Sequence, residues 1–206
     1  AEKERKFQTA LENTVNASLF SGDSSQSNFF SNSASMQSAH AESSSDIQGL
    51  SRISLPKDDH CLYRAVSLYL FDADVPSLRL IVAKTLENNL DYFLEFIQLP
   101  QNVPMQQLIE NIRSGNEWAG EVEIQILMHI LQRPIVVLDN NGKIRNQAGI
   151  EQYLAQPPIF VYYDDVNHYD GLLLNENNGR ELLEQLQLEQ NNAASASNRN
   201  AVISNQ

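Results

Sequence analysis

The only cysteine of the chain, Cys61, lies where a polar turn gives way to an apolar helical pattern. The turn is Asp58–His60, and the helical pattern begins at Leu62. A helix N-terminus carries roughly half a positive charge and several unpaired N–H groups, so a sulfur placed there is favoured as thiolate, the form that attacks carbonyl carbons. The position of Cys61 therefore predicts a nucleophile.

A candidate base lies far downstream, where His168 follows the apolar run Ile159–Tyr163. Asp170 adds a carboxylate two residues later. An imidazole can take the proton of a thiol, and a carboxylate can fix the tautomer of the imidazole. The other histidines have poorer settings, namely His40 in a polar stretch, His60 beside the cysteine and His129 inside a helical pattern. Cys61 and the His168 cluster together predict a cysteine hydrolase.

Two other interpretations of Cys61 fit the sequence less well. A lone cysteine is usually a small core residue, with about one in ten catalytic, but Cys61 lies at the polar boundary of its helix. A structural zinc site needs about four ligands at short paired spacings, and the sequence has no CxxC or HxxxH pair. We therefore expect no metal and no cofactor.

Length and charge limit the class of protein. The 206 residues have room for one ordinary domain with flanking segments. A net charge of −12, without a basic stripe, argues against nucleic acid as a partner. A single cysteine cannot form an internal disulfide, which favours a reducing compartment, so we expect a cytoplasmic protein. No stretch approaches about 20 apolar residues, so no membrane span is expected.

Composition divides the chain into a middle that should fold and two polar ends. Residues 1–49 combine a short amphipathic helix with a Ser-, Asn- and Gln-rich linker that we expect to be disordered. Residues 50–190 are expected to form the catalytic domain, which closes with a helix from about Arg180. Residues 191–206 are polar and predict a disordered tail.

Helices are expected where apolar residues recur every three or four positions. They cover residues 62–71, 78–97, 105–112 and 121–131. After Pro134 the pattern changes to short continuous apolar runs, which predict strands. These cover residues 135–138, 159–163 and 168–174, and the turn Asp139–Gly142 leads from the first of them into Lys143 and Ile144. The fold class is therefore α+β, with a small central β-sheet packed between helices.

Three blocks of the sequence resemble, in order, motifs of the OTU (ovarian tumour) cysteine proteases, which are deubiquitinases. Asp58–Ala65 (DDHCLYRA) is similar to the family's Asp-Gly-Asn/Asp-Cys-Leu-Phe-Arg-Ala. Trp118–Ile124 (WAGEVEI), with the strand that follows, resembles its Trp-Gly-x-x-x-Glu-Ile helix. Asn167–Asp170 (NHYD) resembles its terminal His-Tyr-Asp. The likeness spans about residues 53–174 and implies a papain-like OTU fold.

The resemblance implies a role for each matching residue. Cys61 would be the nucleophile, His168 the general base, and Asp58 the acidic member of the cysteine loop. Asp170 would orient the imidazole, and which of Asp58 and Asp170 supports His168 directly stays open. Backbone N–H groups of residues 59–61 would line an oxyanion hole, where a single donor contributes about 3–4 kcal/mol.

The cysteine loop departs from the family pattern at two positions. Asp59 stands where the family usually has Gly, and His60 stands where it usually has Asn or Asp. Because a residue other than glycine resists a positive φ, we expect an oxyanion loop that is differently formed, or closed until substrate binds, and low or conditional activity. Alternatively, His60 would lower the pKa of the neighbouring thiol.

The resemblance implies a cysteine-type deubiquitinase that hydrolyses isopeptide bonds after the C-terminal glycine of ubiquitin. Its partners would be ubiquitin, polyubiquitin chains or a ubiquitin-like modifier. The polar ends suggest a secreted effector of an intracellular bacterium. Two alternatives stay open: a catalytically silent OTU-like module that binds ubiquitin, motivated by Asp59 and His60, and a thiol protease that acts on another modifier or polypeptide.

Overall fold

The computed structural model describes residues 9, 46–70, 73–95, 103–153, 155–174 and 179–203, with side chains up to residue 192. The predicted amphipathic helix and disordered linker lie outside these ranges, apart from Thr9, which is helical, and residues 46–49. The predicted division at residue 49 therefore stays a prediction.

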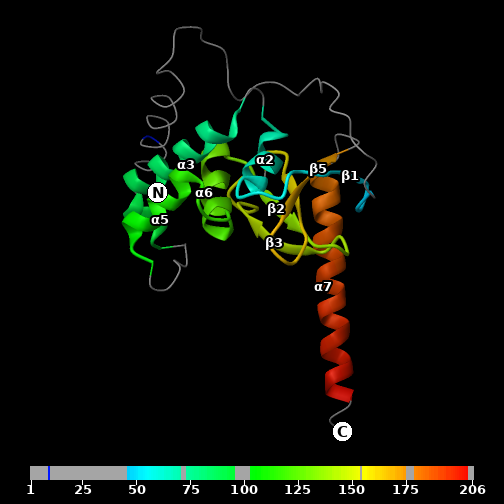
Figure 1. Cartoon of the computed structure of the whole chain (residues 1–206). Helices are drawn as coiled ribbons and strands as arrows, with labels where there is room; N and C mark the ends of the chain where they lie inside the picture. Colours follow the sequence, from blue (N-terminus) through cyan, green and yellow to red (C-terminus); the bar gives the residue numbers. More distant parts are fainter. Residues whose placement is uncertain are drawn as a thin grey trace.

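A five-stranded sheet forms the centre of the fold (Figure 1). Its strands are β1 (Leu50–Ile53), β2 (Ile135–Leu138), β3 (Ile144–Ala148), β4 (Ile159–Tyr163) and β5 (Tyr169–Leu174). They lie in the order β1-β5-β4-β2-β3, with β2 parallel to β4 and the other neighbours antiparallel. The strands predicted from continuous apolar runs are confirmed. β1 was not predicted, because its four residues include Ser51 and Arg52 and show no such run.

Helices cover both faces of this sheet. They are α2 (Cys61–Ser67), α3 (Val75–Asn88), α4 (Leu90–Phe93), α5 (Met105–Ser114), α6 (Glu121–Leu131) and α7 (Gly179–Ile203). One core joins α2, α3, α5 and α6 to one face, and a second core joins the other face to α7 through Leu183 and Leu186. Figure 1 shows α7 lying against the sheet and running on beyond it. The predicted α+β class, with a sheet between helices, is confirmed.

The helix that begins with the cysteine packs directly on the strand that follows the histidine. In β5, a Cβ atom at Gly171 would collide with the side chain of Leu68, which caps α2. The Tyr69 hydroxyl donates to the carbonyl of Leu172 and accepts from the N–H of Phe160 at 3.3 Å. This close approach brings the first residue of α2 beside the first residue of β5.

The helix predicted over residues 78–97 is wrong in one respect, since it is divided in two. α3 ends at Asn88, and Asn89, with φ −130°, separates it from α4. The Asn89 side chain donates to the carbonyl of Thr85 at 2.9 Å, in the way that asparagine competes with helical hydrogen bonds. The remainder of the predicted segment, residues 96 and 97, lies outside the described ranges.

Two other helix ends differ from the prediction. α2 ends at Ser67, earlier than expected, and residue 71 lies outside the described ranges. α7 continues to Ile203, where the sequence predicted a disordered tail from residue 191. The tail contains several alanines, the residue of highest helix propensity, which favours continuation of a helix already nucleated upstream.

Candidate active site

Cys61 is buried at the first position of α2, with 2% of its surface exposed. Its Sγ accepts a hydrogen bond from the backbone N–H of Tyr169 at 3.4 Å. Burial raises the pKa of the Cys61 thiol, hydrogen bonds from the N–H groups of Tyr169 and Leu62 offset part of this rise, and the charge of Asp58 adds to it. The free protein therefore holds Cys61 as a thiol, and its ionisation requires a nearby base.

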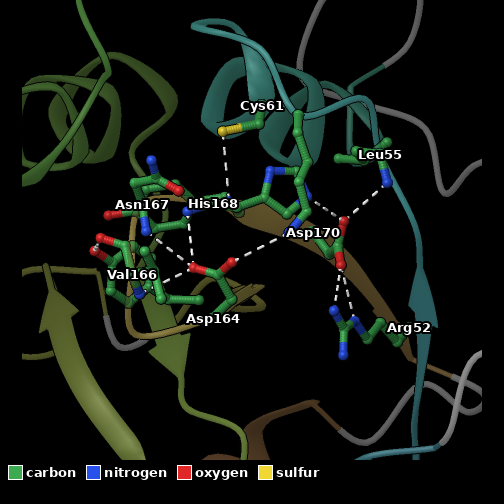
Figure 2. A network of polar contacts seen from close by, with 11 residues as sticks. Arg52, Leu55, Cys61, Asp164, Val166, Asn167, His168 and Asp170 are labelled. Carbon is green, nitrogen blue, oxygen red and sulfur yellow. Dashed lines mark hydrogen bonds and ion pairs between the residues drawn. The ribbon is translucent and has the colours of Figure 1, made fainter.

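His168 lies immediately before β5, and its side chain is buried. Nε2 lies 2.8 Å from Oδ1 of Asp170, so this nitrogen carries the proton and donates a hydrogen bond to the carboxylate. Nδ1 is buried, and no group within the described ranges forms a hydrogen bond with it. Figure 2 shows the His168 side chain between Cys61 and Asp170. The lone pair of Nδ1 is thus available to accept the proton of the thiol.

Asp170 is held by four hydrogen bonds, which Figure 2 shows together. Besides His168, its Oδ1 accepts from the backbone N–H of Leu55 at 2.8 Å. Its Oδ2 accepts from Nε and Nη2 of Arg52 at 2.8 and 2.6 Å. The Arg52 guanidinium lies 3.7 Å from the centroid of the Tyr162 ring. Because the carboxylate is fixed on both oxygens, it fixes the orientation of the imidazole.

A second aspartate shapes the loop that carries His168. Oδ1 of Asp164 accepts from the backbone N–H groups of Val166, Asn167 and His168 at 2.9–3.0 Å, and Oδ2 lies 3.6 Å from Nζ of Lys57. Burial acts to raise the pKa of Asp164, but the three N–H groups and the lysine charge outweigh it and lower this pKa to about 2. The ionised carboxylate therefore holds the loop closed on itself.

Asp58 binds the cysteine loop and a neighbouring arginine. Its Oδ1 accepts from the backbone N–H of His60 at 3.0 Å, and its Oδ2 pairs with Nη2 of Arg64 at 2.8 Å. Burial acts to raise the pKa of Asp58, but the arginine and the N–H group lower it overall. Of the two aspartates that the sequence left open, Asp170 contacts the imidazole and Asp58 contacts the loop.

The backbone of the cysteine loop needs no glycine at position 59. Among the described residues, the non-glycine residues with a positive φ are Gln48, Gln132 and Asp165, so Asp59 has an ordinary φ. The carbonyl of Asp59 accepts from Nη2 of Arg79, and Nδ1 of His60 accepts from Nε of the same arginine at 2.9 Å. Nδ1 of His60 is therefore directed at Arg79 and not at the thiol.

The N–H groups of this loop are partly occupied. The N–H of His60 is bonded to the Asp58 side chain, and the N–H of Cys61 donates to the Asp58 carbonyl at 3.2 Å. The N–H of Asp59 forms no hydrogen bond with any group in the described part of the chain. Of the three donors expected at an oxyanion hole, one is free and two are shared with Asp58.

Sequence reasoning missed three side chains that support the site: Arg52, Arg79 and Asp164. Arg79 gave a signal, because it is a charged residue between Leu78 and Ile81 on the apolar face of a predicted helix. Asp164 also gave one, since an aspartate shortly before a turn commonly accepts the N–H groups that follow it. Arg52 gave none, because its partner lies more than a hundred residues away.

Within the described ranges, no group of three or more His, Cys, Asp and Glu side chains is placed to hold a metal ion. The helices in those ranges include none that is long and apolar enough to cross a membrane.

Comparison with known proteins identifies relatives of this arrangement. A family model described as OTU-like cysteine protease matches residues 56–171. Deubiquitinase OTUD6B of Gallus gallus is 31% identical over 134 residues, which cover 58% of this chain and 44% of that protein. An ovarian tumor domain-containing deubiquitinating enzyme 4 of Arabidopsis thaliana is 30% identical over 140 residues, covering 60% of this chain and 43% of that protein. The chain thus spans less than half the length of these curated relatives.

A solved structure of an ovarian tumor (OTU) domain in complex with ubiquitin is similar in fold. It aligns with a TM-score of 0.52 at 22% identity, over 68% of this chain and 83% of that chain. The predicted OTU fold is therefore confirmed.

Proposed function

Because the chain belongs to the OTU family of cysteine proteases, we propose that it is a cysteine-type deubiquitinase that hydrolyses isopeptide bonds after the C-terminal glycine of ubiquitin. One observation carries the proposal. His168 keeps a buried Nδ1 that no described group occupies, while its Nε2 is bonded to Asp170. A base prepared in this way beside a buried thiol is what nucleophilic catalysis by cysteine requires. The deubiquitinase relatives support ubiquitin as the substrate.

In the proposed reaction, the proton of Cys61 Sγ moves to Nδ1 of His168, and the thiolate attacks the glycine carbonyl. The N–H groups of Asp59 and Cys61 would stabilise the negative charge on the carbonyl oxygen. The imidazolium then gives its proton to the leaving lysine amine, which leaves a thioester on the sulfur. A water molecule that the same imidazole deprotonates hydrolyses this thioester, and Asp170 stabilises the imidazolium in each step.

We assign different roles to the two aspartates. Asp170 would act on the imidazole, because it accepts from His168 Nε2. Asp58 would act on the cysteine loop, because its carboxylate and its carbonyl both accept from that loop. Asp59 and His60 would contribute the backbone of the oxyanion loop.

The proposed partners are ubiquitin and polyubiquitin chains, with a ubiquitin-like modifier as the alternative partner to be tested. A cytoplasmic location is proposed from the single cysteine, whose free thiol survives best in a reducing compartment. Origin as a bacterial effector stays a prediction from the polar ends; the relatives named above come from a bird and a plant.

The proposal is tested with ubiquitin that carries a thiol-reactive group at its C-terminus. We expect wild type to gain the mass of one ubiquitin, Cys61→Ser to gain none, and His168→Ala to react far more slowly. A small alkylating agent, applied in parallel, checks that the thiol of wild type is accessible. If the thiol reacts with the small agent but never with the ubiquitin probe, the proposed activity is wrong.

A silent ubiquitin-binding module is the second candidate. The raised pKa of the thiol and the occupied N–H of His60 favour it, because both lower the reactivity of the free protein. Such a module would bind ubiquitin equally well with Cys61 or with Cys61→Ala, and neither form would cleave a ubiquitin chain. Chain cleavage by wild type that the alanine variant lacks excludes it.

A further inference from the structure

Arg79 in α3 is a buried cation whose donors converge on the cysteine loop. Only 2% of its surface is exposed, and no carboxylate in the described ranges lies within ion-pair distance of it. Nε donates to Nδ1 of His60 at 2.9 Å, Nη2 donates to the carbonyl of Asp59, and Nη1 donates to the carbonyl of Ile112 at 3.1 Å. The guanidinium carbon lies 4.5 Å from the centroid of the Tyr63 ring.

Packing alone does not explain an arginine at this position. Residues around it on α3, Leu78, Ile81 and Val82, form an apolar face, and a leucine or methionine would fill the site without a charge. Glu123, which is also buried, interacts electrostatically with Arg79 without a direct ion pair, and a buried cation of this kind costs several kcal/mol unless its hydrogen bonds are well made. Here they are made to the cysteine loop and to α5, so the position of the charge is tied to the geometry of the loop.

The contact with Asp59 sets the orientation of one peptide unit. The peptide plane is rigid, and its C=O and N–H point in opposite directions. When Arg79 holds the carbonyl of Asp59, the N–H of His60 must point the other way, where Asp58 Oδ1 accepts it. The contact with Arg79 therefore fixes the orientation of the peptide unit between Asp59 and His60.

The side chain of His60 forms the second contact between Arg79 and the cysteine loop. Because its Nδ1 accepts from Arg79, the ring is neutral and its proton is on Nε2. Gly115, which ends α5 with φ +75°, leaves room for the ring, since a Cβ atom there would lie 2.6 Å from His60 Cε1. The family pattern has Asn or Asp at this position, and either side chain also offers an acceptor atom to a guanidinium.

We propose that Arg79 and His60 are a positioning pair that sets the backbone of the cysteine loop for binding of the oxyanion. The inference rests on the proposed function, because an oxyanion forms only if the protein attacks a carbonyl group. It adds that the unusual His60 is an equivalent acceptor for Arg79 and not a defect of the loop. Neither side chain is assigned a contact with substrate, so both act by positioning the backbone.

The first test compares His60→Asn, which keeps an acceptor, with His60→Leu, which does not. The substrate is ubiquitin with a fluorophore amide at its C-terminus. Since misplacing a catalytic group by about 1 Å costs about a hundredfold, we expect His60→Leu to lower kcat at least about 30-fold with little change in KM, and His60→Asn to stay within about threefold of wild type. Alkylation of Cys61 by a small reagent, which needs no oxyanion hole, should change less than about twofold in both.

A double-mutant cycle shows whether the two residues act as a pair. In an Arg79→Gln background, His60→Leu should lower kcat by less than about a further twofold, because the arginine that donates to His60 is already absent. Arg113→Gln is the matched control, since this arginine forms exposed ion pairs with Glu110 and Glu87 and should be neutral. Losses that multiply across the cycle, or an equal loss in His60→Asn and His60→Leu, would overturn the pairing.

A measurement without substrate separates this inference from the proposed function. Nitrogen-15 NMR of the free protein should show an unprotonated Nδ1 on His60 and a slowly exchanging Nε proton on Arg79. His60→Asn should keep that slow proton, and His60→Leu should lose it. A proton on Nδ1 of His60 contradicts the pair, whatever the protein does to ubiquitin. A wild type that never forms a ubiquitin adduct refutes the proposed function and leaves the NMR result as the measure of the pair.

Discussion

Replacement of the two aspartates by asparagine distinguishes their roles. Asp170→Asn keeps the shape of the side chain, but an amide cannot accept hydrogen bonds from both Arg52 and His168. If the amide nitrogen faces Arg52, it meets two donors, Nε and Nη2. If it faces His168, it becomes the donor, so Nε2 must accept and the proton moves to Nδ1. In that second state the imidazole cannot take the proton of the thiol.

The magnitude follows from the burial of each carboxylate. The bond between His168 and Asp170 joins side chains that are each 2% exposed, and hydrogen bonds to charged groups contribute about 1.5–3 kcal/mol. At about 1.4 kcal/mol per factor of ten, Asp170→Asn should lower kcat/KM about 10- to 150-fold. Asp58→Asn keeps an oxygen for the N–H of His60 and loses the ion pair with Arg64. Both members of that pair are more than a third exposed, so about 0–1 kcal/mol, or at most about fivefold, is expected.

The assay is cleavage of ubiquitin that carries a C-terminal fluorophore amide, with thermal unfolding of each variant to show that it is folded at the assay temperature. The pH dependence of Cys61 alkylation supplies a second measure. Asp170→Asn should move it to higher pH, because the imidazolium that accompanies the thiolate loses its carboxylate. If Asp58→Asn loses more activity than Asp170→Asn while both remain folded, our assignment of the aspartates is wrong.

Three further predictions concern the elements around the site. Asp164→Ala should destabilise the protein at pH 7, and its difference from wild type should shrink between about pH 4 and about pH 2. The reason is that a carboxylate with a lowered pKa contributes stability above its unfolded value of 3.8 and loses it as the pH falls through about 2. Urea unfolding across this range measures the effect, and a constant difference would contradict it. Burial raises the pKa of Glu123, so wild type should lose stability as the pH rises through that pKa. Glu123→Gln, which keeps an oxygen for the N–H of Gly120, should lose less stability over the same pH range. The measurement is the fall in melting temperature between pH 5 and pH 8, and an equal fall in the two proteins would contradict the prediction. Gly171→Val should lower stability by about 1–3 kcal/mol, because its side chain would push Leu68 away from the strand. Chemical denaturation tests this, and an unchanged midpoint would show that the contact is loose.

The parts of the fold that could be predicted are those whose apolar pattern is uniform. β2 and β4 are buried on both faces, and α6 carries apolar residues three or four positions apart, so local sequence determined them. β1 depends on pairing with β5, a strand more than a hundred residues away, and its own residues give no pattern. The break at Asn89 depends on a side-chain hydrogen bond that periodicity does not register.

The site divides in a similar way. Cys61 and His168 could be predicted because the chemistry of a thiol nucleophile limits the residue types and because the changes from turn to helix and from loop to strand mark their places. The choice between Asp58 and Asp170 could not be predicted, since it depends on which carboxylate the packing of β5 against β1 turns towards the imidazole. Arg52 and Arg79 were also missed: Arg52 gave no local signal, and the charge of Arg79 on an apolar helix face did not show which groups it binds. Each acts through partners that are distant in sequence.

In the free protein, the thiol and two of the N–H groups of the cysteine loop are not in the state that the reaction requires. Burial keeps Cys61 protonated, and Asp58 occupies the N–H groups of His60 and Cys61. In the proposed reaction, a substrate carbonyl would compete with the carbonyl of Asp58 for the N–H of Cys61, at a net difference of about 1 kcal/mol for the exchanged hydrogen bond. The Asp58 carboxylate stays paired with Arg64 and bonded to the N–H of His60, so this exchange involves only the main-chain oxygen of Asp58. The departures from the family pattern at positions 59 and 60 thus leave the loop well formed, and we expect activity to depend on whether the substrate displaces the Asp58 carbonyl from the N–H of Cys61.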